Sequence, residues 1–262
     1  NRDSTSDREK AMSDADNDHG QPLVEHLIEL RSRLLYALLS VLIIFLPLFY
    51  FANEIYIFIS EPLRMFLPEG TSMIATEVAS PFLTPFKLTL VLAIFIAMPY
   101  ILHQIWSFIA PGLYVNEKRV AAPLLISSIV LFYTGIAFAF FVVFPLVFGF
   151  FTSVAPEGVT VMTDINRYLD FVLKLFFAFG LAFEIPIATV LLIWTGATTP
   201  ESMASKRPYV IVGCFIVGML LTPPDVISQI LLALPMWILY EAGIIFAKVF
   251  RLGQTTDHAT LS

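Results

Sequence analysis

Six long apolar segments constrain the fold of this chain of 262 residues more than any other feature. A transmembrane α-helix needs about 20 predominantly apolar residues to cross a hydrocarbon core about 30 Å thick. Five of the segments are close to that length or longer, and the fifth in order is clearly shorter. They are residues 34–52, 85–108, 121–150, 168–194, 209–221 and 226–250. The pattern predicts an all-α integral membrane protein with six transmembrane helices, some of them kinked by proline, and a short fifth span.

The composition agrees with a membrane protein and excludes several other classes. Hydrophobic residues make up 58% of the chain and charged residues 14%, whereas soluble domains carry about 25% charge. The formal net charge is −6, but eight of the 21 acidic residues lie within the first 30, which leaves the remainder close to neutral. A near-neutral membrane domain argues against a nucleic-acid partner. The single cysteine, Cys214, permits no internal disulfide.

The distribution of Lys and Arg predicts the orientation in the membrane. Six spans place both termini on one side, and the side richer in Lys and Arg is normally cytoplasmic. Eleven basic residues fall on the side of the termini and four on the other, and the bias remains eight to four without residues 1–11. We therefore expect both termini to be cytoplasmic. The four on the opposite side are Arg64, Lys87, Arg167 and Lys174.

The two ends of the chain differ from the apolar middle. Residues 1–20 are polar and acidic, which predicts a disordered tail. This stretch lacks the basic start and apolar run of a secretory signal peptide. Because the chain begins with Asn, we expect Met12 to be the natural first residue and residues 1–11 to be an addition for expression. Residues 21–250 then form one membrane domain, and 251–262 form a cytoplasmic tail.

An amphipathic helix precedes the first span. Pro22 suits its first turn, and Glu29 and Arg33 are four residues apart, so they can pair on the helix surface. Two interpretations remain open. The helix can lie at the membrane surface with Arg31 and Arg33 as anchors, or it can present Glu29 to a cationic ligand. Its apolar stripe consists of Leu23, Leu27, Leu30 and Leu34.

Four segments, in order along the chain, resemble signatures of the TatC family, the multispanning receptor subunit of the twin-arginine protein translocase. They are HLIELRSRL at 26–34, FIAPGLYVNEKR at 108–119, FEIP at 183–186 and LTPPDVISQ at 221–229. Together they extend the resemblance over about residues 21–250. The resemblance implies residence in the bacterial cytoplasmic (inner) membrane and transport driven by the proton-motive force.

The resemblance also implies a binding site for twin-arginine signal peptides of folded cargo at the cytoplasmic face. A guanidinium group offers a planar fork of donors that a carboxylate accepts in bidentate fashion. The family assigns this task to the positions of Glu29 and Glu117, and we expect the site to include Arg31, Arg33, Leu34 and Phe108. For Glu117 a second interpretation remains, a local charge cluster with Lys118 and Arg119 that caps the third span.

A carboxyl group lies about halfway along the fourth apolar segment, at Glu184. Pro186, two residues later, should kink the helix or free backbone carbonyl groups. Intramembrane carboxylates are costly, so Glu184 calls for an explanation. It is either a polar site that faces a partner or cargo, or a protonated and hydrogen-bonded group buried between helices.

Polar residues also mark the start of the sixth apolar segment. Asp225 follows two prolines and suits the N-cap of the last helix, and Gln229 is one turn further on the same face. An amide inside the membrane favours a hydrogen bond to another helix. The resemblance implies that this edge binds the single-span TatA-type and TatB-type subunits, and that the chain nucleates translocon assembly and associates with further copies of itself.

A proton-coupled secondary transporter of a small solute, with Glu184 as its ionisable group, is the alternative function. An enzyme is disfavoured because the chain has no HExxH, GxSxG, Walker A or GxGxxG motif. The four histidines show no metal-binding spacing, so we expect neither a metal nor a cofactor.

Overall fold

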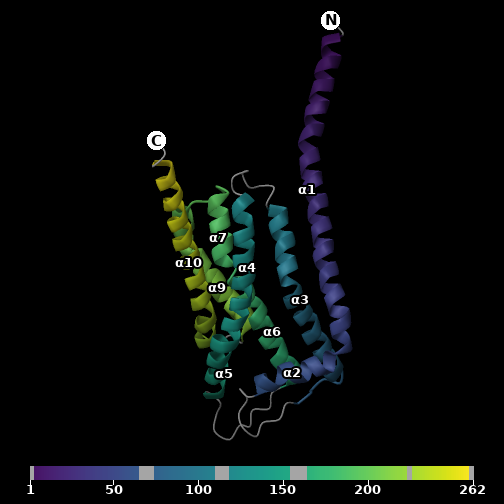
Figure 1. Ribbon diagram of the computed structural model, residues 1–262, viewed down its shortest axis with the longest axis vertical. Helices are drawn as coiled ribbons and strands as arrows, with labels where there is room; N and C mark the ends of the chain where they lie inside the picture. Colours follow the sequence, from purple (N-terminus) through teal and green to yellow (C-terminus); the bar gives the residue numbers. More distant parts are fainter. Residues whose placement is uncertain (1–2, 65–73, 110–117, 154–163, 223–225, 260–262) are drawn as a thin grey trace.

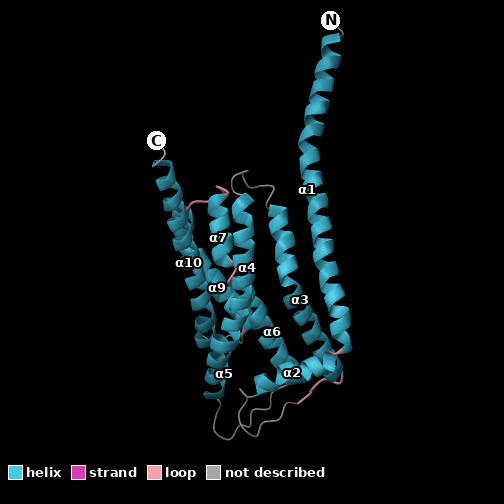
Figure 2. Cartoon of the chain, in the orientation of Figure 1, coloured by secondary structure: helices cyan, strands magenta, loops and turns pink. Residues whose placement is uncertain are grey.

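The computed structural model describes residues 3–64, 74–109, 118–153, 164–222 and 226–259; within these ranges only the backbone is described for 3–26, 59–64, 118–121, 152 and 250–259. All the described elements are helices, joined by short loops (Figure 2), and the one bridge between extended residues in the described chain is an isolated parallel one, between Ile74 and Asp164. The helices are α1 (Asp3–Tyr50), α2 (Ala52–Arg64), α3 (Ser80–Ile109), α4 (Lys118–Phe138), η2 (Ala139–Val143), α5 (Phe144–Ser153), α6 (Ile165–Ala182), α7 (Ile185–Trp194), α8 (Pro200–Ser205), α9 (Arg207–Leu221) and α10 (Val226–Ala259).

Five described segments are long and apolar enough to cross a membrane. The predicted all-α class and five of the six predicted segments are thereby confirmed. The remaining apolar helix, α9, has 15 residues, or about 22 Å of helix, which is short for a span. The five long segments are Leu27–Tyr50, Ser80–Ile109, Ala122–Phe151, Ile165–Trp194 and Val226–Val249.

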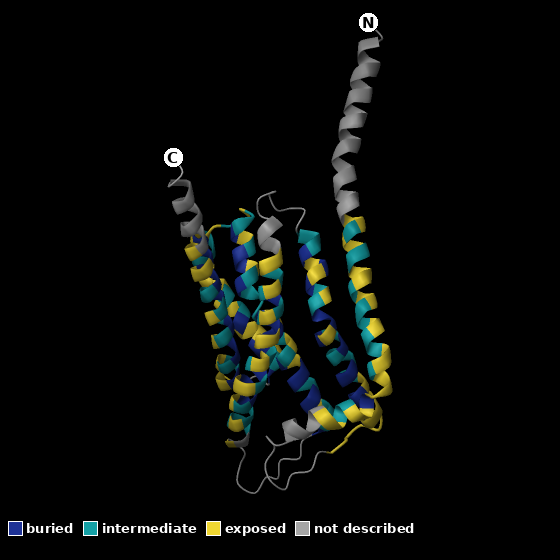
Figure 3. Cartoon of the chain, viewed as in Figure 1, coloured by how far each residue is buried: buried dark blue, intermediate teal, exposed yellow. Residues whose placement is uncertain are grey.

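Helix α1 is continuous from Asp3, although the composition of residues 1–20 predicts disorder. The side chains of this stretch lie outside the described part of the chain, so its division from the membrane domain stays a prediction. Further along, α1 packs beside α3 at one edge of the bundle, and both termini lie toward the same end (Figure 1). Within an 18-residue apolar stretch of its membrane-length segment only 6% is buried, against 44% in the corresponding stretch of Ile165–Trp194; Figure 3 shows the contrast. In a bilayer most of the segment Leu27–Tyr50 therefore faces lipid or a partner.

Two breaks interrupt the long helices at prolines, as the sequence predicts for Pro186. This residue has no N–H to donate to the carbonyl of Ala182, so α6 ends there and α7 begins at Ile185. In the third segment, the π-helical turn Ala139–Val143 precedes Pro145. The wider turn accommodates the proline ring, which would otherwise collide with the carbonyl of Phe141.

At the end of the bundle where α3 begins, one carboxylate joins two distant parts of the chain. Asp164 caps α6 by accepting hydrogen bonds from Asn166 N and Arg167 N, at 2.9 and 3.0 Å. It also accepts one from Thr76 N at 3.0 Å and another from the Thr76 hydroxyl. These bonds, led by the one from the Thr76 side chain, lower the pKa of Asp164 to about 2.

The low pKa of Asp164 predicts that acid weakens its contacts with Thr76 and with the first turn of α6. The folded-state pKa of Asp164 lies below its ordinary value of 3.8, so its stabilising effect is present above about pH 4 and is lost as the pH falls toward about 2. We expect the thermal midpoint of the wild type to fall over this range, and Asp164→Asn to flatten the fall. Exposed Glu77, on the same segment as Thr76, provides the control Glu77→Gln. A pH profile that is identical in wild type and Asp164→Asn would contradict the prediction.

Candidate functional site

A hollow of about 370 Å³ lies between α1 and α3, toward the end of the bundle where both termini lie. On each helix the lining residues recur over steps of three and four positions, so they lie on one face. Helix α1 contributes Glu29, Ser32, Arg33 and Tyr36, and α3 contributes Tyr100, His103 and Gln104.

Arg33, which lines the hollow, has its guanidinium group held between the side chains of Glu29 and Gln104, which together form a polar clamp. Arg33 Nε and Nη2 both donate to Glu29 Oε1, at 2.9 and 2.6 Å. Arg33 Nη1 donates to Gln104 Oε1 at 3.3 Å, which links the two helices. The side chains of Arg33 and Glu29 are 26% and 35% exposed, so the pair is sheltered and still reachable. No described residue donates to the second oxygen of Glu29, Oε2, which remains free to accept a hydrogen bond.

An aromatic surface borders this clamp. The rings of Tyr100 and His103 are stacked, with centroids 6.3 Å apart and planes inclined by 26°. A guanidinium group stacks well on such flat faces. The hollow therefore combines a carboxylate, an amide oxygen and aromatic faces, which are the groups that bind arginine.

The other predicted binding residues do not all meet at this hollow. Arg31 and Leu34 are exposed on α1 and do not line it. Phe108 is half-buried one turn beyond Gln104 on α3. Glu117 lies outside the described residues, so its place beside Glu29 stays a prediction.

Sequence reasoning did not identify five residues of the hollow. His103 and Gln104 carry a usable signal, because they are polar side chains inside an otherwise apolar segment. The others gave no signal that separates them from the aromatic and small residues common near membrane interfaces. The five are Ser32, Tyr36, Tyr100, His103 and Gln104.

Glu184 lies at the break between α6 and α7. The Ser128 hydroxyl of α4 donates a hydrogen bond to Glu184 Oε2. The other oxygen, Oε1, is buried and has no partner among the described residues. This geometry is that of a carboxyl group held between helices, and a role of Glu184 toward a partner or cargo stays a prediction.

The α9–α10 edge carries the residues predicted to contact partner subunits. Gln229 is half-buried, and its side chain makes no hydrogen bond to any described residue; Asp225 lies outside the described residues. At the other end of α9, Arg207 Nε and Nη2 donate to Glu241 Oε1 and Oε2 of α10, at 2.6 and 2.7 Å. This ion pair, which sequence reasoning did not anticipate, fixes the short helix against α10.

Comparison with known proteins agrees with these observations. A family model described as "Sec-independent protein translocase protein (TatC)" matches residues 25–235. The TatC protein of Azotobacter chroococcum mcd 1 is 65% identical over 236 residues, which cover 90% of this chain and 92% of that protein. The TatC protein of Escherichia coli (strain K12) is 59% identical over 230 residues, 88% of this chain and 89% of that one.

A solved structure, described as "Crystal Structure of Twin Arginine Translocase Receptor- TatC", has the same fold. It superposes with a TM-score of 0.78 at 40% sequence identity, covering 86% of this chain and 98% of that chain. These relatives are named as protein translocase proteins, which indicates a transport role in a multi-pass membrane protein. The chain therefore belongs to the TatC family, the receptor subunit of the Sec-independent protein translocase.

Proposed function

We propose that this chain binds the twin-arginine signal peptides of folded cargo proteins in the hollow between α1 and α3, and that it then nucleates assembly of the translocation site. The observation that carries the proposal is the clamp formed by Glu29 and Gln104, which already holds one guanidinium group, that of Arg33. None of the relatives named above is a solute transporter, so the transporter alternative is not retained.

Binding proceeds by exchange between guanidinium groups. One signal arginine binds the free oxygen of Glu29 or replaces Arg33 at Oε1, and the second stacks on Tyr100 and His103. Exchange between like groups keeps the carboxylate paired throughout, which avoids the cost of leaving a sheltered charge unpaired. Glu117 provides a second carboxylate, and Leu34 and Phe108 contact the apolar residues that follow the arginine pair.

The hollow faces the cytoplasm in this proposal. Six spans, with α9 as the short fifth, bring both termini to the cytoplasmic side of the bacterial inner membrane. Two observations support the topology. Both termini lie toward the same end of the bundle (Figure 1), and Lys and Arg are concentrated on that side of the sequence.

The experiment that tests the function compares two labelled signal peptides on the purified full chain in lipid. One peptide carries consecutive arginines and the other carries lysines in their place. A lysine ammonium cannot form the planar bidentate pair, so we expect the arginine peptide to bind about tenfold more tightly, or about 1.4 kcal/mol. Equal affinities for the two peptides would overturn the proposal.

The α9–α10 edge binds the single-span TatA-type and TatB-type subunits, and further copies of this chain join the same complex. Helix α9 is shorter than the hydrocarbon core, so it needs shelter from neighbouring helices or local thinning of the bilayer. The amide of Gln229, which has no hydrogen-bond partner in the described chain, provides a polar contact for an incoming helix.

Replacing Gln229 with Leu tests this assignment. We expect the substitution to weaken association with a TatB-type subunit by about threefold, because interhelical hydrogen bonds in membranes contribute about 0.6 kcal/mol on average. Co-purification in detergent measures the association. Ile230→Leu, a conservative change at the next position, is the matched control. Loss of signal-peptide binding with intact subunit association would show that the two sites are wrongly divided.

A further inference from the structure

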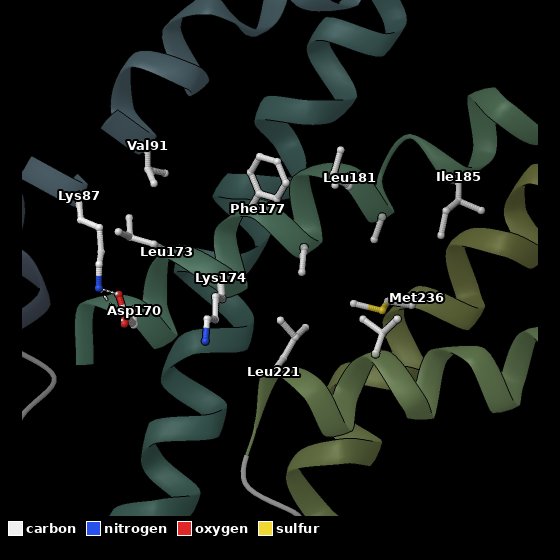
Figure 4. A pocket seen from close by; sticks show the side chains of 13 residues that line it. Lys87, Val91, Asp170, Leu173, Lys174, Phe177, Leu181, Ile185, Leu221 and Met236 are labelled. Atoms are coloured by element: carbon white, nitrogen blue, oxygen red, sulfur yellow. Dashed lines mark hydrogen bonds and ion pairs between the residues drawn. The ribbon is translucent and has the colours of Figure 1, made fainter. Parts of the chain in front are cut away.

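A larger groove, of about 790 Å³, lies among α3, α6, α7, α9 and α10, apart from the hollow that holds Arg33 (Figure 4). Its volume is in the range of cavities that enclose small organic ligands, about 300–1,000 Å³. Most of its wall is apolar, and the charged side chains Lys87, Asp170 and Lys174 lie together toward one end. The apolar wall includes Leu173, Phe177, Leu181, Ile185, Leu221 and Met236.

The charged end of the groove has a net positive charge. Lys87 Nζ donates to Asp170 Oδ1 and Oδ2, at 2.8 and 3.0 Å, and to Asn166 Oδ1 at 3.0 Å. This ion pair neutralises Asp170. Lys174, one turn further along α6, makes no hydrogen bond or ion pair with any described residue. The groove therefore carries one positive charge beside an apolar wall.

Lys174 lies well inside its membrane-length segment, so its unpaired charge indicates what kind of ligand the groove can bind. Lys174 follows Ile165, where the membrane-length segment begins, by nine residues, or about 14 Å along the helix. Ionisable groups inside a membrane are costly and normally pair with another group or line a polar cavity. Lys174 is exposed, Asp170 beside it is already paired with Lys87, and the rest of the wall is apolar, so a partner that fills the groove and pairs with the ammonium group brings both an anion and hydrocarbon.

We propose that the groove binds an anionic phospholipid, with its phosphodiester beside Lys174 and its acyl chains along the apolar wall. The charge selects the lipid class. A phosphatidylglycerol headgroup brings one negative charge, which matches the one unbalanced cation. A phosphatidylethanolamine headgroup brings an additional ammonium group, and the groove's carboxylate, Asp170, is already paired with Lys87.

Native mass spectrometry of the purified full chain tests the proposal. The protein is released from nanodiscs that contain equal amounts of phosphatidylglycerol and phosphatidylethanolamine with the same acyl chains. We expect the wild type to retain phosphatidylglycerol preferentially. Lys174→Gln should lower the retained ratio about fivefold, because one Lys contributes about 1 kcal/mol to binding of anionic lipid. Lys174→Arg keeps the charge and should keep the preference.

Two further variants distinguish lipid binding in the groove from nonspecific attraction of anionic lipid to any cation of the protein. Lys206→Gln removes an exposed cation elsewhere and should leave the ratio unchanged. Ala178→Trp keeps Lys174 but fills the groove that Ala178 lines, so it should also lose the lipid. Each variant must elute as a single species with the wild-type thermal midpoint.

Three outcomes would overturn the proposal. The first is wild-type retention of phosphatidylglycerol by Lys174→Gln, and the second is an equal loss in Lys206→Gln, which would indicate nonspecific charge. The third is that Ala178→Trp lowers binding of a labelled signal peptide and leaves lipid retention unchanged, which would assign the groove to the apolar part of the peptide.

Discussion

Glu29→Gln is expected to weaken binding of a twin-arginine signal peptide by about 10- to 150-fold. The carboxylate of Glu29 already accepts two hydrogen bonds from a guanidinium group, and hydrogen bonds to charged groups contribute about 1.5–3 kcal/mol. A neutral amide of the same shape retains one acceptor oxygen but loses the charge. Titration of the labelled arginine peptide onto the purified chain in lipid measures the loss.

The ion pair of Glu241 with Arg207 offers a matched control. It is also a carboxylate–guanidinium pair joined by two hydrogen bonds, but it lies between α9 and α10, away from the hollow. Glu241→Gln should therefore leave peptide affinity unchanged. Wild-type affinity in Glu29→Gln, with the preference for arginine over lysine intact, would place the binding site elsewhere.

Gly135→Ala is expected to lower the free energy of unfolding by about 1–3 kcal/mol. Gly135 lies in α4 where that helix crosses α6. A Cβ at this position would lie 2.5 Å from the backbone oxygen of Phe179 and 3.0 Å from Gly180 Cα. These neighbours are backbone atoms, so no rotamer change relieves the collision, and the two helices must move apart.

The chain provides both a probe and a control for this measurement. Cys214, its single cysteine, is 7% exposed, so a dye that fluoresces on reaction with thiols reports unfolding. Gly213→Ala adds the same methyl group where nothing lies within 4 Å, and Ala favours helix over Gly. Gly213→Ala should therefore leave the free energy of unfolding unchanged or raise it. If Gly135→Ala unfolds at the wild-type temperature, then α4 and α6 do not approach this closely.

The spacing and chemistry of nearby residues were enough to predict the Glu29–Arg33 pair and the helix break before Ile185. Glu29 and Arg33 are four residues apart, so their contact follows from helical geometry alone. The break before Ile185 follows from the missing N–H of Pro186. The apolar segments follow from the length that a bilayer imposes on a helix.

By itself, then, the sequence determined the all-α membrane class, the long apolar helices and the pairing of Glu29 with Arg33. Only the tertiary structure decided which distant residues complete each site. Gln104 is 71 residues from Arg33, and Lys87 is 83 from Asp170. Periodicity states which face of a helix is polar or apolar, but the neighbour of that face depends on how all the helices pack. For the same reason, the groove beside Lys174 could not be predicted, because a lysine in an apolar helix has the same sequence pattern whether it faces lipid, water or a cavity.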